Sequence, residues 1–365
     1  MKKILVVDWL DKFGGAERVI QSIDKVFEFD KYYSLINIMN DKDLHKTFNS
    51  KKVIVNVTGL QIFKQKFRLL LPLFPFYIKS IHVDKNVSLI ISSSHAVAKS
   101  VCTDNSLHIS YFQARNLKYI WDEQSLYFNG IKSIFKIFIP AFKRFDFLAA
   151  QKPNYLIANS KFVQNWIKKI YKRESTLIYP PVDIHEFNLE KEKDDYYVTV
   201  GRLVQYKRFD ILVKVFNDLP NKKLLIIGDG TERLNLERQS NKNIIFKGYL
   251  DQSGVRKYIS KAKCFIFAGV EDFGIAPVEA QACGTPVIAL NKAGTAETVV
   301  NGLTGVYFNN QTEEDVVGAI NKFEANYANF DPVVIRNHAL QFSSERFEKE
   351  IKEFVEEKYN NFIKQ

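Results

Sequence analysis

Cysteine is scarce in this chain. Three cysteines, Cys102, Cys264 and Cys283, occur in 365 residues, and the last two lie in apolar runs typical of a buried strand and a buried helix. Cysteines so few and so far apart exclude a disulfide framework, and they lack the spacing of zinc ligands. We therefore predict neither a structural disulfide nor a zinc site.

Long hydrophobic runs are also missing. No segment reaches the roughly 18 consecutive apolar residues of a membrane-spanning helix. The apolar run from Ile4 to Val7 is too short for a signal-peptide core and is followed at once by Asp8. We expect the protein in the cytoplasm, in solution or peripherally at the inner face of the cytoplasmic membrane.

The overall composition is that of a folded protein, with 46% hydrophobic and 25% charged residues. The length suggests two domains, because one hydrophobic core seldom extends over 365 residues. The net charge of +11 is uneven: residues 1–185 hold 28 Lys and Arg against 15 Asp and Glu. Such a basic half can attract nucleic acid or an anionic membrane, and charge alone does not choose between them.

Large apolar residues are interleaved with basic ones between Phe63 and Lys79, and again between Ile131 and Phe147. The first run carries Lys64, Lys66 and Arg68. This composition suits a segment in the headgroup layer of an anionic membrane. It suits equally an ordinary helix with a solvated cationic edge, which Pro72 and Pro75 would interrupt. The second run favours the membrane surface, and we expect no nucleic-acid partner.

Short β-type runs alternate with longer helical runs along the whole chain, which predicts parallel sheets joined by crossover helices. The expected strands are 4–7, 53–57, 89–92, 107–112 and 155–158 in the first half and 197–200, 223–227, 244–246, 264–267 and 286–290 in the second. We therefore predict an α/β protein with two doubly wound, Rossmann-like domains facing a cleft.

The clearest domain boundary is the proline pair in Tyr179 to Asp183. It predicts an N-terminal domain over 1–183, a C-terminal domain over 184–340 and a helical tail over 341–365. In that tail, Phe347, Ile351 and Val355 share one helix face. Because this face is apolar, we expect it to pack against another part of the protein.

The strongest chemical signal lies between Phe265 and Leu290. A strand leads into a glycine-containing loop, and a helix is expected to run from Pro277 until Gly284 ends it. The start of such a helix can bind phosphate through its free amides. Glu279, expected in the first turn, can accept hydrogen bonds from ribose hydroxyls, or can serve only as a favourable helix charge.

Glu271 and Glu279 form an E-x7-E pattern followed by a helix frame, and together they resemble the retaining glycosyltransferases of family 4, in particular bacterial mannosyltransferases of surface-polysaccharide assembly. The other landmarks of the resemblance, in the family's order, are Gly14–Glu17, Ala158–Ser160, Tyr179–Asp183, Gly201–Val204 with Lys207–Asp210, and Ile226–Gly230. The resemblance implies the glycosyltransferase-B (GT-B) fold, with the last helix crossing back to the first domain.

The resemblance also implies residue roles in binding a nucleotide-sugar donor. Arg202 and Lys207 would hold the diphosphate, Glu271 the donor sugar and Glu279 the ribose. Backbone groups would complete the site, from Gly14, Gly15, Gly248, Tyr249, Gly274, Ile275 and Ala276. Paired cations can stabilise a departing diphosphate, and the sequence has no Asp-x-Asp in an obvious metal loop, so we expect neither a metal nor another cofactor.

The acceptor side departs from the relatives, which have histidine and proline where this chain has Gln113 and Arg115. Glutamine cannot take up a proton near neutral pH, which excludes a histidine base at that position. His95 can line the cleft or can be a structural histidine. The resemblance favours transfer of mannose from GDP-mannose to a glycan or polyprenyl-linked glycan. A UDP-sugar or other GDP-sugar donor, an epimerase or phosphorylase on the same fold, and a non-catalytic binding module remain alternatives.

Overall fold

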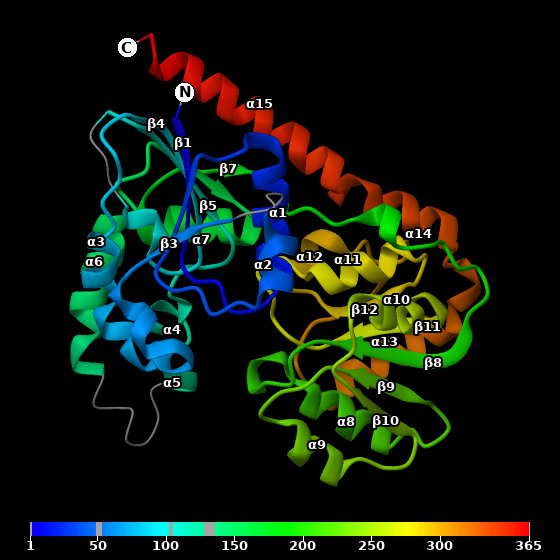
Figure 1. The fold of residues 1–365 in the computed structure, drawn as a ribbon. Coiled ribbons are helices and arrows are strands. Elements are labelled where there is room, and N and C mark those ends of the chain that lie inside the picture. The colour runs from blue at the N-terminus through cyan, green and yellow to red at the C-terminus, as the bar shows by residue number, and fades with distance from the viewer. Residues whose placement is uncertain (1, 49–52, 102–104, 128–135, 365) are drawn as a thin grey trace. The chain divides into compact units, whose positions relative to one another are not determined.

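The computed structural model describes residues 2–48, 53–101, 105–127 and 136–364. The chain divides into two compact units, which we call the N-terminal unit (1–181 with 347–365) and the C-terminal unit (182–346). The sequence placed the divisions at 183/184 and 340/341, and the compact units divide at 181/182 and 346/347. Each unit is an α/β structure with a single parallel sheet, as predicted (Figure 1).

The N-terminal unit is built on a seven-stranded sheet with the order β3-β2-β1-β4-β5-β6-β7. Its strands are β1 (Lys2–Val7), β2 (Lys31–Ser34), β3 (Val55–Val57), β4 (Val87–Ser94), β5 (Leu107–Phe112), β6 (Tyr155–Ala158) and β7 (Thr176–Leu177). Its helices are α1 (Gly15–Phe27), α2 (Asp41–Thr47), α3 (Phe74–Lys79), α4 (Lys118–Trp121), α5 (Gln124–Tyr127), α6 (Ile139–Ala149), α7 (Lys161–Tyr171) and most of α15 (Ser344–Phe362). The five predicted strands are present, and β2 and β7 are additional.

Helix α15 completes the core of the N-terminal unit. Its residues Phe347, Ile351 and Val355 are buried in one cluster with Leu5 of β1 and Ile109 of β5. This packing explains the apolar face of the tail, because a helix with one apolar stripe must cover another element. The expectation that the last helix returns to the first domain is confirmed.

The C-terminal unit has a six-stranded sheet with the order β10-β9-β8-β11-β12-β13. Its strands are β8 (Asp194–Val200), β9 (Leu224–Ile227), β10 (Ile244–Gly248), β11 (Ala262–Phe267), β12 (Val287–Leu290) and β13 (Gly305–Phe308). Its helices are α8 (Phe209–Asn217), α9 (Arg233–Gln239), α10 (Gln252–Lys261), α11 (Ile275–Ala282), α12 (Thr295–Thr298), α13 (Glu313–Ala325) and α14 (Pro332–Ala339). The strand β13 was not predicted. Cys264 and Cys283 are buried and free, and Cys102 lies outside the described residues.

The basic, apolar segment predicted between Phe63 and Lys79 is not one helix. Residues Gly59–Leu73 form a run of 3₁₀ turns with non-helical backbone at Lys64 and Leu70, and α3 follows. Pro75 occupies the first turn of α3, where its missing N–H costs nothing. Each helix in the described parts of the chain is too short or too polar to span a lipid bilayer. Part of the second run, residues 131–135, lies outside the described residues.

Candidate nucleotide-sugar site

The strand order of the C-terminal unit reverses between β8 and β11, and in an open parallel sheet ligands bind beyond the carboxyl ends of the strands at such a point. The loops that follow these two strands carry Lys207 and Glu271. Nζ of Lys207 lies 2.8 Å from Oε1 of Glu271, and both side chains are partly exposed. The structure therefore brings together these two predicted site residues.

Lys207 is held by its surroundings as well as by Glu271. It ends a short 3₁₀ turn, Gln205–Lys207, and its ammonium group lies 5.6 Å from the centre of the Phe267 ring. Gly269 packs so closely on the backbone of Lys207 that a Cβ there would lie 3.0 Å from the Lys207 Cα. Arg202 follows the end of β8 and is exposed. A fixed ammonium group and an exposed guanidinium group at one strand end are suited to binding an anion.

Helix α11 begins at Ile275 and not, as predicted, at Pro277. Gly274 precedes it with a φ of 90°, a left-handed conformation that lets the loop turn directly into the helix. The helix ends as predicted, because Gly284 donates to Gln281 O and Thr285 to Ala280 O in a Schellman arrangement. The amides of Ile275 and Ala276 therefore belong to the first turn, where α-helical backbone amides lack partners within the helix.

Glu279 consequently lies in the second turn of α11, and the expectation that it lies in the first turn is wrong. Its side chain is buried, with 6% of the residue exposed. Because the proline expected at the first helical position is actually third, the carboxylate lies two residues further into the helix than predicted. Its role toward ribose stays a prediction.

A third loop, after β12, supports the Glu271 loop and was given no role from the sequence. The amide of Gly294 donates to Glu271 O at 2.9 Å. A Cβ on Gly294 would lie 2.2 Å from Phe273 O, so only glycine allows this approach. In the sequence, Gly294 is visible as a glycine shortly after a predicted strand. Its contact with the Glu271 loop could not be predicted from the sequence.

Gly248 is the last residue of β10, the outer strand of this sheet on the β9 side, and Tyr249 directly follows it. Gly248 has a φ of 67°, and its carbonyl accepts a hydrogen bond of 2.8 Å from Gly228 at the end of β9. The side chain of Tyr249 is largely exposed. The structure therefore places both residues at the carboxyl edge of the sheet, and their contact with a base stays a prediction.

In the N-terminal unit, the predicted glycine loop leads into α1. Gly14 is the N-cap and Gly15 the first helical residue. Glu17, the third helical residue, accepts a hydrogen bond from the Gly14 backbone, which is one half of a capping box. Burial raises the pKa of Glu17 to about 7. No role was predicted for this carboxylate from the sequence, although it lies three residues after the glycine that caps the helix.

The predicted acceptor residues follow β4 and β5 of the same unit. Gln113 donates to Ser93 Oγ at 2.8 Å and to Ala16 O at 3.3 Å, so its amide ties β4 to the start of α1. Arg115 is buried and forms ion pairs with Asp122 and Glu123 at 3.2 and 3.1 Å. His95 lies directly after β4. An acceptor role for each of these residues stays a prediction.

Within the described parts of the chain, no group of three or more His, Cys, Asp or Glu residues is arranged to hold a metal ion. The expectation of a metal-free reaction is untested.

The two units together have the fold of the GT-B glycosyltransferases. The structure superposes on that of Anabaena HepE in complex with UDP and glucose with a TM-score of 0.74, at 19% identity, covering 98% of this chain and all of the other. At this level of identity the similarity shows the fold alone.

Residues 182–339 match the family model Glycosyl transferases group 1. This segment contains Arg202, Lys207, Glu271 and Glu279, and it lies within the C-terminal unit. The match therefore covers the unit in which the Lys207–Glu271 pair is found.

Curated relatives match over part of their length. An uncharacterised 41.2 kDa protein in the cps region of Klebsiella pneumoniae is 29% identical over 168 residues, 45% of each chain. The O-antigen chain mannosyltransferase RfbU of Salmonella typhimurium is 25% identical over 190 residues, which are 48% of this chain and 53% of RfbU. The alignments thus span about half the length of these relatives.

Proposed function

We propose that this protein is a retaining glycosyltransferase of family 4 that moves mannose from GDP-mannose to a glycan or polyprenyl-linked glycan in bacterial surface-polysaccharide assembly. The observation that carries the proposal is the Lys207–Glu271 pair at the strand ends of a unit that matches a glycosyl transferase family model. The partial similarity to RfbU supports mannose as the transferred sugar. The UDP bound to HepE supports a nucleotide-sugar donor and keeps a UDP-sugar as the alternative.

The charges of the pair suit the two ends of a sugar diphosphate. Lys207 and the exposed Arg202 would take the diphosphate, whose charge grows as the bond to the sugar breaks. Glu271, once Lys207 binds phosphate, would be free to accept hydrogen bonds from sugar hydroxyls. Lys207 and Glu271 would thus separate when the donor binds. Lys207 would then pair with the diphosphate, and Glu271 would accept hydrogen bonds from the sugar.

The proposed reaction needs no side-chain base. The acceptor hydroxyl oxygen bonds to the anomeric carbon while the bond from that carbon to the diphosphate oxygen breaks, and that oxygen takes the hydroxyl proton. Arg202 and Lys207 stabilise the departing diphosphate, so the reaction would need no metal. Full activity in the presence of EDTA is the expected result, and loss of activity restored by Mg²⁺ would contradict it.

The test is release of nucleoside diphosphate from GDP-mannose and from several UDP- and GDP-sugars, with and without a mannoside acceptor. Release that depends on the acceptor, with an α-linked product by NMR, supports retaining transfer. Binding of a donor without any turnover would show a non-catalytic module. Arg202→Ala and Glu271→Ala should each lower transfer strongly, and wild-type rates in both would refute the site.

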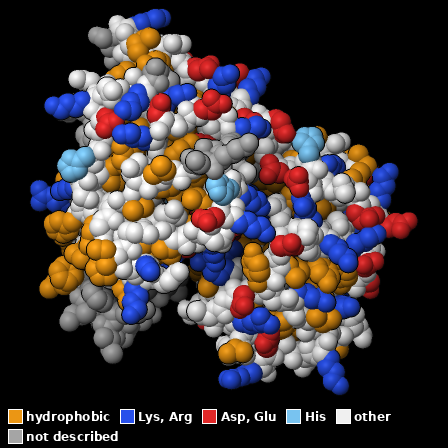
Figure 2. All heavy atoms as spheres, viewed as in Figure 1, with side chains coloured by type: hydrophobic (Ala, Val, Ile, Leu, Met, Phe, Trp, Pro, Cys, Tyr) orange, Lys and Arg blue, Asp and Glu red, His pale blue; other side chains and the backbone are white. Residues whose placement is uncertain are grey.

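We also propose that the N-terminal unit binds the anionic inner face of the cytoplasmic membrane. Hydrophobic side chains gather at the left margin of Figure 2, where Figure 1 places α3 and α6. The large apolar side chains exposed along 59–79 and just before α6 are Ile62, Phe63, Leu69, Leu73, Phe76, Ile137 and Phe138. Exposed Lys64, Lys66, Lys79 and Lys136 lie between them in the sequence, a mixture suited to anionic headgroups.

Vesicle sedimentation tests the membrane proposal. Combined replacement of Leu69 and Phe76 by Ser and of Lys64 and Lys66 by Glu should abolish binding to phosphatidylglycerol vesicles. Arg68 is left unchanged because it pairs with Asp11. Leu234→Ser, on an exposed side chain of the C-terminal unit, is the control and should bind as the wild type. Unchanged binding of the combined variant would refute the surface.

A further inference from the structure

Asp8 forms an unusual set of hydrogen bonds at the strand-order reversal of the N-terminal unit. Asp8 directly follows β1 and is 1% exposed. Its carboxylate accepts hydrogen bonds from the backbone N–H groups of four consecutive residues in the loop after β4. His95 and Ala96 donate to Oδ2 at 2.6 and 2.8 Å, and Val97 and Ala98 donate to Oδ1 at 2.6 and 2.7 Å. Burying a carboxylate without hydrogen bonds is costly, and these four amides supply them. They also fix the loop against β1.

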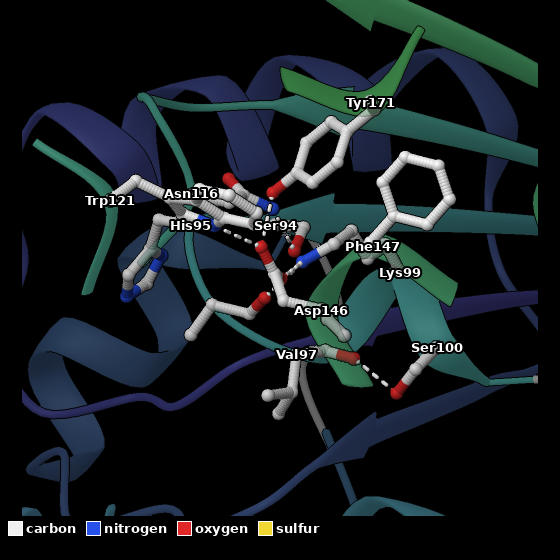
Figure 3. A network of polar contacts seen from close by, with 12 residues as sticks. Ser94, His95, Val97, Lys99, Ser100, Asn116, Trp121, Asp146, Phe147 and Tyr171 are labelled. Atoms are coloured by element: carbon white, nitrogen blue, oxygen red, sulfur yellow. Dashed lines mark hydrogen bonds and ion pairs between the residues drawn. The ribbon is translucent and has the colours of Figure 1, made fainter. Parts of the chain in front are cut away.

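A second buried network holds the same loop from its other side (Figure 3). Lys99 is completely buried, donates to Ala96 O, and pairs with Asp146 of α6 at 2.6 Å. The other oxygen of Asp146 accepts from Tyr171 Oη at 2.6 Å and from Trp121 Nε1 at 2.7 Å. The loop therefore has little freedom to move, because ion pairs and hydrogen bonds satisfy it on two sides.

His95 is the residue of this loop whose side chain reaches solvent, with 28% of it exposed. Its ring lies edge-on to Trp9, with the ring centres 4.1 Å apart, and Nδ1 lies 3.5 Å from Asp8 Oδ2. In Figure 3 the ring points away from the Lys99–Asp146 network. A carboxylate next to Nδ1 favours the tautomer that carries its proton there, and Nε2 is left as a hydrogen-bond acceptor.

We propose that Asp8 and His95 form an acceptor-binding dyad, in which Nε2 of His95 accepts a hydrogen bond from a hydroxyl group of the acceptor sugar other than the one that attacks. The inference rests on the proposed glycosyl transfer. Asp8 is the positioning residue, acting through the imidazole, and His95 takes no proton in the reaction. The attacking hydroxyl still passes its proton to the departing diphosphate.

The charges around His95 agree with a neutral imidazole. Burial lowers the pKa of His95, and Arg68 and Lys99 lower it further. Asp8 and Asp11 oppose this effect. A neutral ring can accept a hydrogen bond at Nε2, whereas a protonated ring cannot. Acceptor binding should therefore weaken as the pH falls and His95 becomes protonated.

The experiment measures transfer from GDP-mannose, or from whichever donor the screen selects, to octyl α-mannoside. His95→Phe keeps the ring and removes the acceptor nitrogen, so the KM for octyl α-mannoside should rise about tenfold, the loss of about one hydrogen bond. The KM for the donor should stay unchanged. His95→Gln can still offer an amide oxygen and should recover most of the loss.

A pH series distinguishes binding from a merely structural role. The wild-type KM for octyl α-mannoside should rise only as the pH is lowered below the ordinary histidine pKa of 6.5, because the pKa of His95 is lowered. The His95→Gln value should not change, because its amide does not titrate. Asp8→Asn places an amide against four N–H donors and is expected to disturb the loop, so the His95 variants carry the test. An unchanged acceptor KM in folded His95→Phe overturns the dyad and leaves glycosyl transfer standing. No turnover by the wild type with any donor overturns the proposed function itself.

Discussion

Nζ of Lys207 lies 2.8 Å from Oε1 of Glu271, so the two opposite charges neutralise each other. Under the proposed function, a free nucleoside diphosphate offers phosphate to Lys207 but lacks the transferred sugar that Glu271 would bind. We predict that Glu271→Gln binds GDP about fivefold more tightly than the wild type, because a partly exposed ion pair of about 1 kcal/mol no longer has to be broken. The same variant should transfer sugar more slowly.

Titration calorimetry with GDP, or with the nucleoside diphosphate of the selected donor, measures this effect. Glu313→Gln removes the exposed partner of Lys214 and should bind as the wild type. Weaker binding by Glu271→Gln would mean that the carboxylate helps to hold the diphosphate and does not compete with it.

Glu17 makes the stability of the N-terminal unit depend on pH. Its pKa is about 7 in the folded protein against 4.5 as the ordinary value, so the folded state keeps this proton over the window between them. The free energy of unfolding should therefore fall as the pH rises through the window, by about 3 kcal/mol in total from this group. Glu17→Gln cannot lose a proton and should lack this contribution.

Urea unfolding of both proteins at about pH 5 and at about pH 8 tests the sign. Tryptophan fluorescence is selective, since Trp9, Trp121 and Trp166 all lie in the N-terminal unit. Relative to the wild type, Glu17→Gln should be more stable at the higher pH than at the lower. An equal difference at both values would contradict the raised pKa.

Gly294 controls the Glu271 loop through close packing. A methyl group there would lie 2.2 Å from Phe273 O and 2.3 Å from its Cα, so Gly294→Ala must displace the loop. We predict at least a tenfold loss in donor affinity, since one misplaced hydrogen-bonding group costs about 1.4 kcal/mol. Gly318→Ala, inside α13, is the matched control, because nothing lies within 4 Å of a Cβ there. It should keep the donor affinity and be at least as stable as the wild type, because alanine favours a helix more than glycine does. Full donor affinity in Gly294→Ala would show that the loop position is unimportant.

The buried face of α15 should contribute strongly to the N-terminal unit. Ile351 is fully buried against the sheet, and Ile351→Ala should lower the free energy of unfolding by about 2–5 kcal/mol. Lys349→Ala, at a side chain that is 74% exposed, should change it by less than about 0.5 kcal/mol. Tryptophan fluorescence during urea unfolding compares the two, and equal midpoints would show that the helix adds little.

The sequence predicted the strands of both sheets because most have apolar runs of four or more residues. It missed β7, which has only two residues, and β2 (KYYS) and β13 (GVYF), in which Lys, Ser or Gly shortens the apolar run. It also started α11 at its proline, although proline is tolerated anywhere in a first turn and Gly274 was the actual starting signal.

The Lys207 and Glu271 positions could be expected from motif spacing, since both follow strands that meet at the order reversal. Asp8 could not be identified in this way. Its four partners lie 87 to 90 residues away, and their hydrogen bonds arise only when β1 and β4 become neighbours. A single acidic residue after a strand has no local pattern that distinguishes a loop anchor from a solvated charge.

The return of residues 347–365 to the N-terminal unit makes the two halves unequal as building blocks. The C-terminal unit is one uninterrupted stretch, 182–346, and its match to the family model falls inside that stretch. Replacing the C-terminal unit by the equivalent stretch of another protein with the same fold needs two junctions, one on each side of the unit. The terminal helix of this chain then stays in place. A single fusion at the proline pair would instead join the N-terminal part of this chain to the whole C-terminal part of another protein. The last helix would then come from that other protein, and its apolar face would have to pack on the sheet of this N-terminal unit.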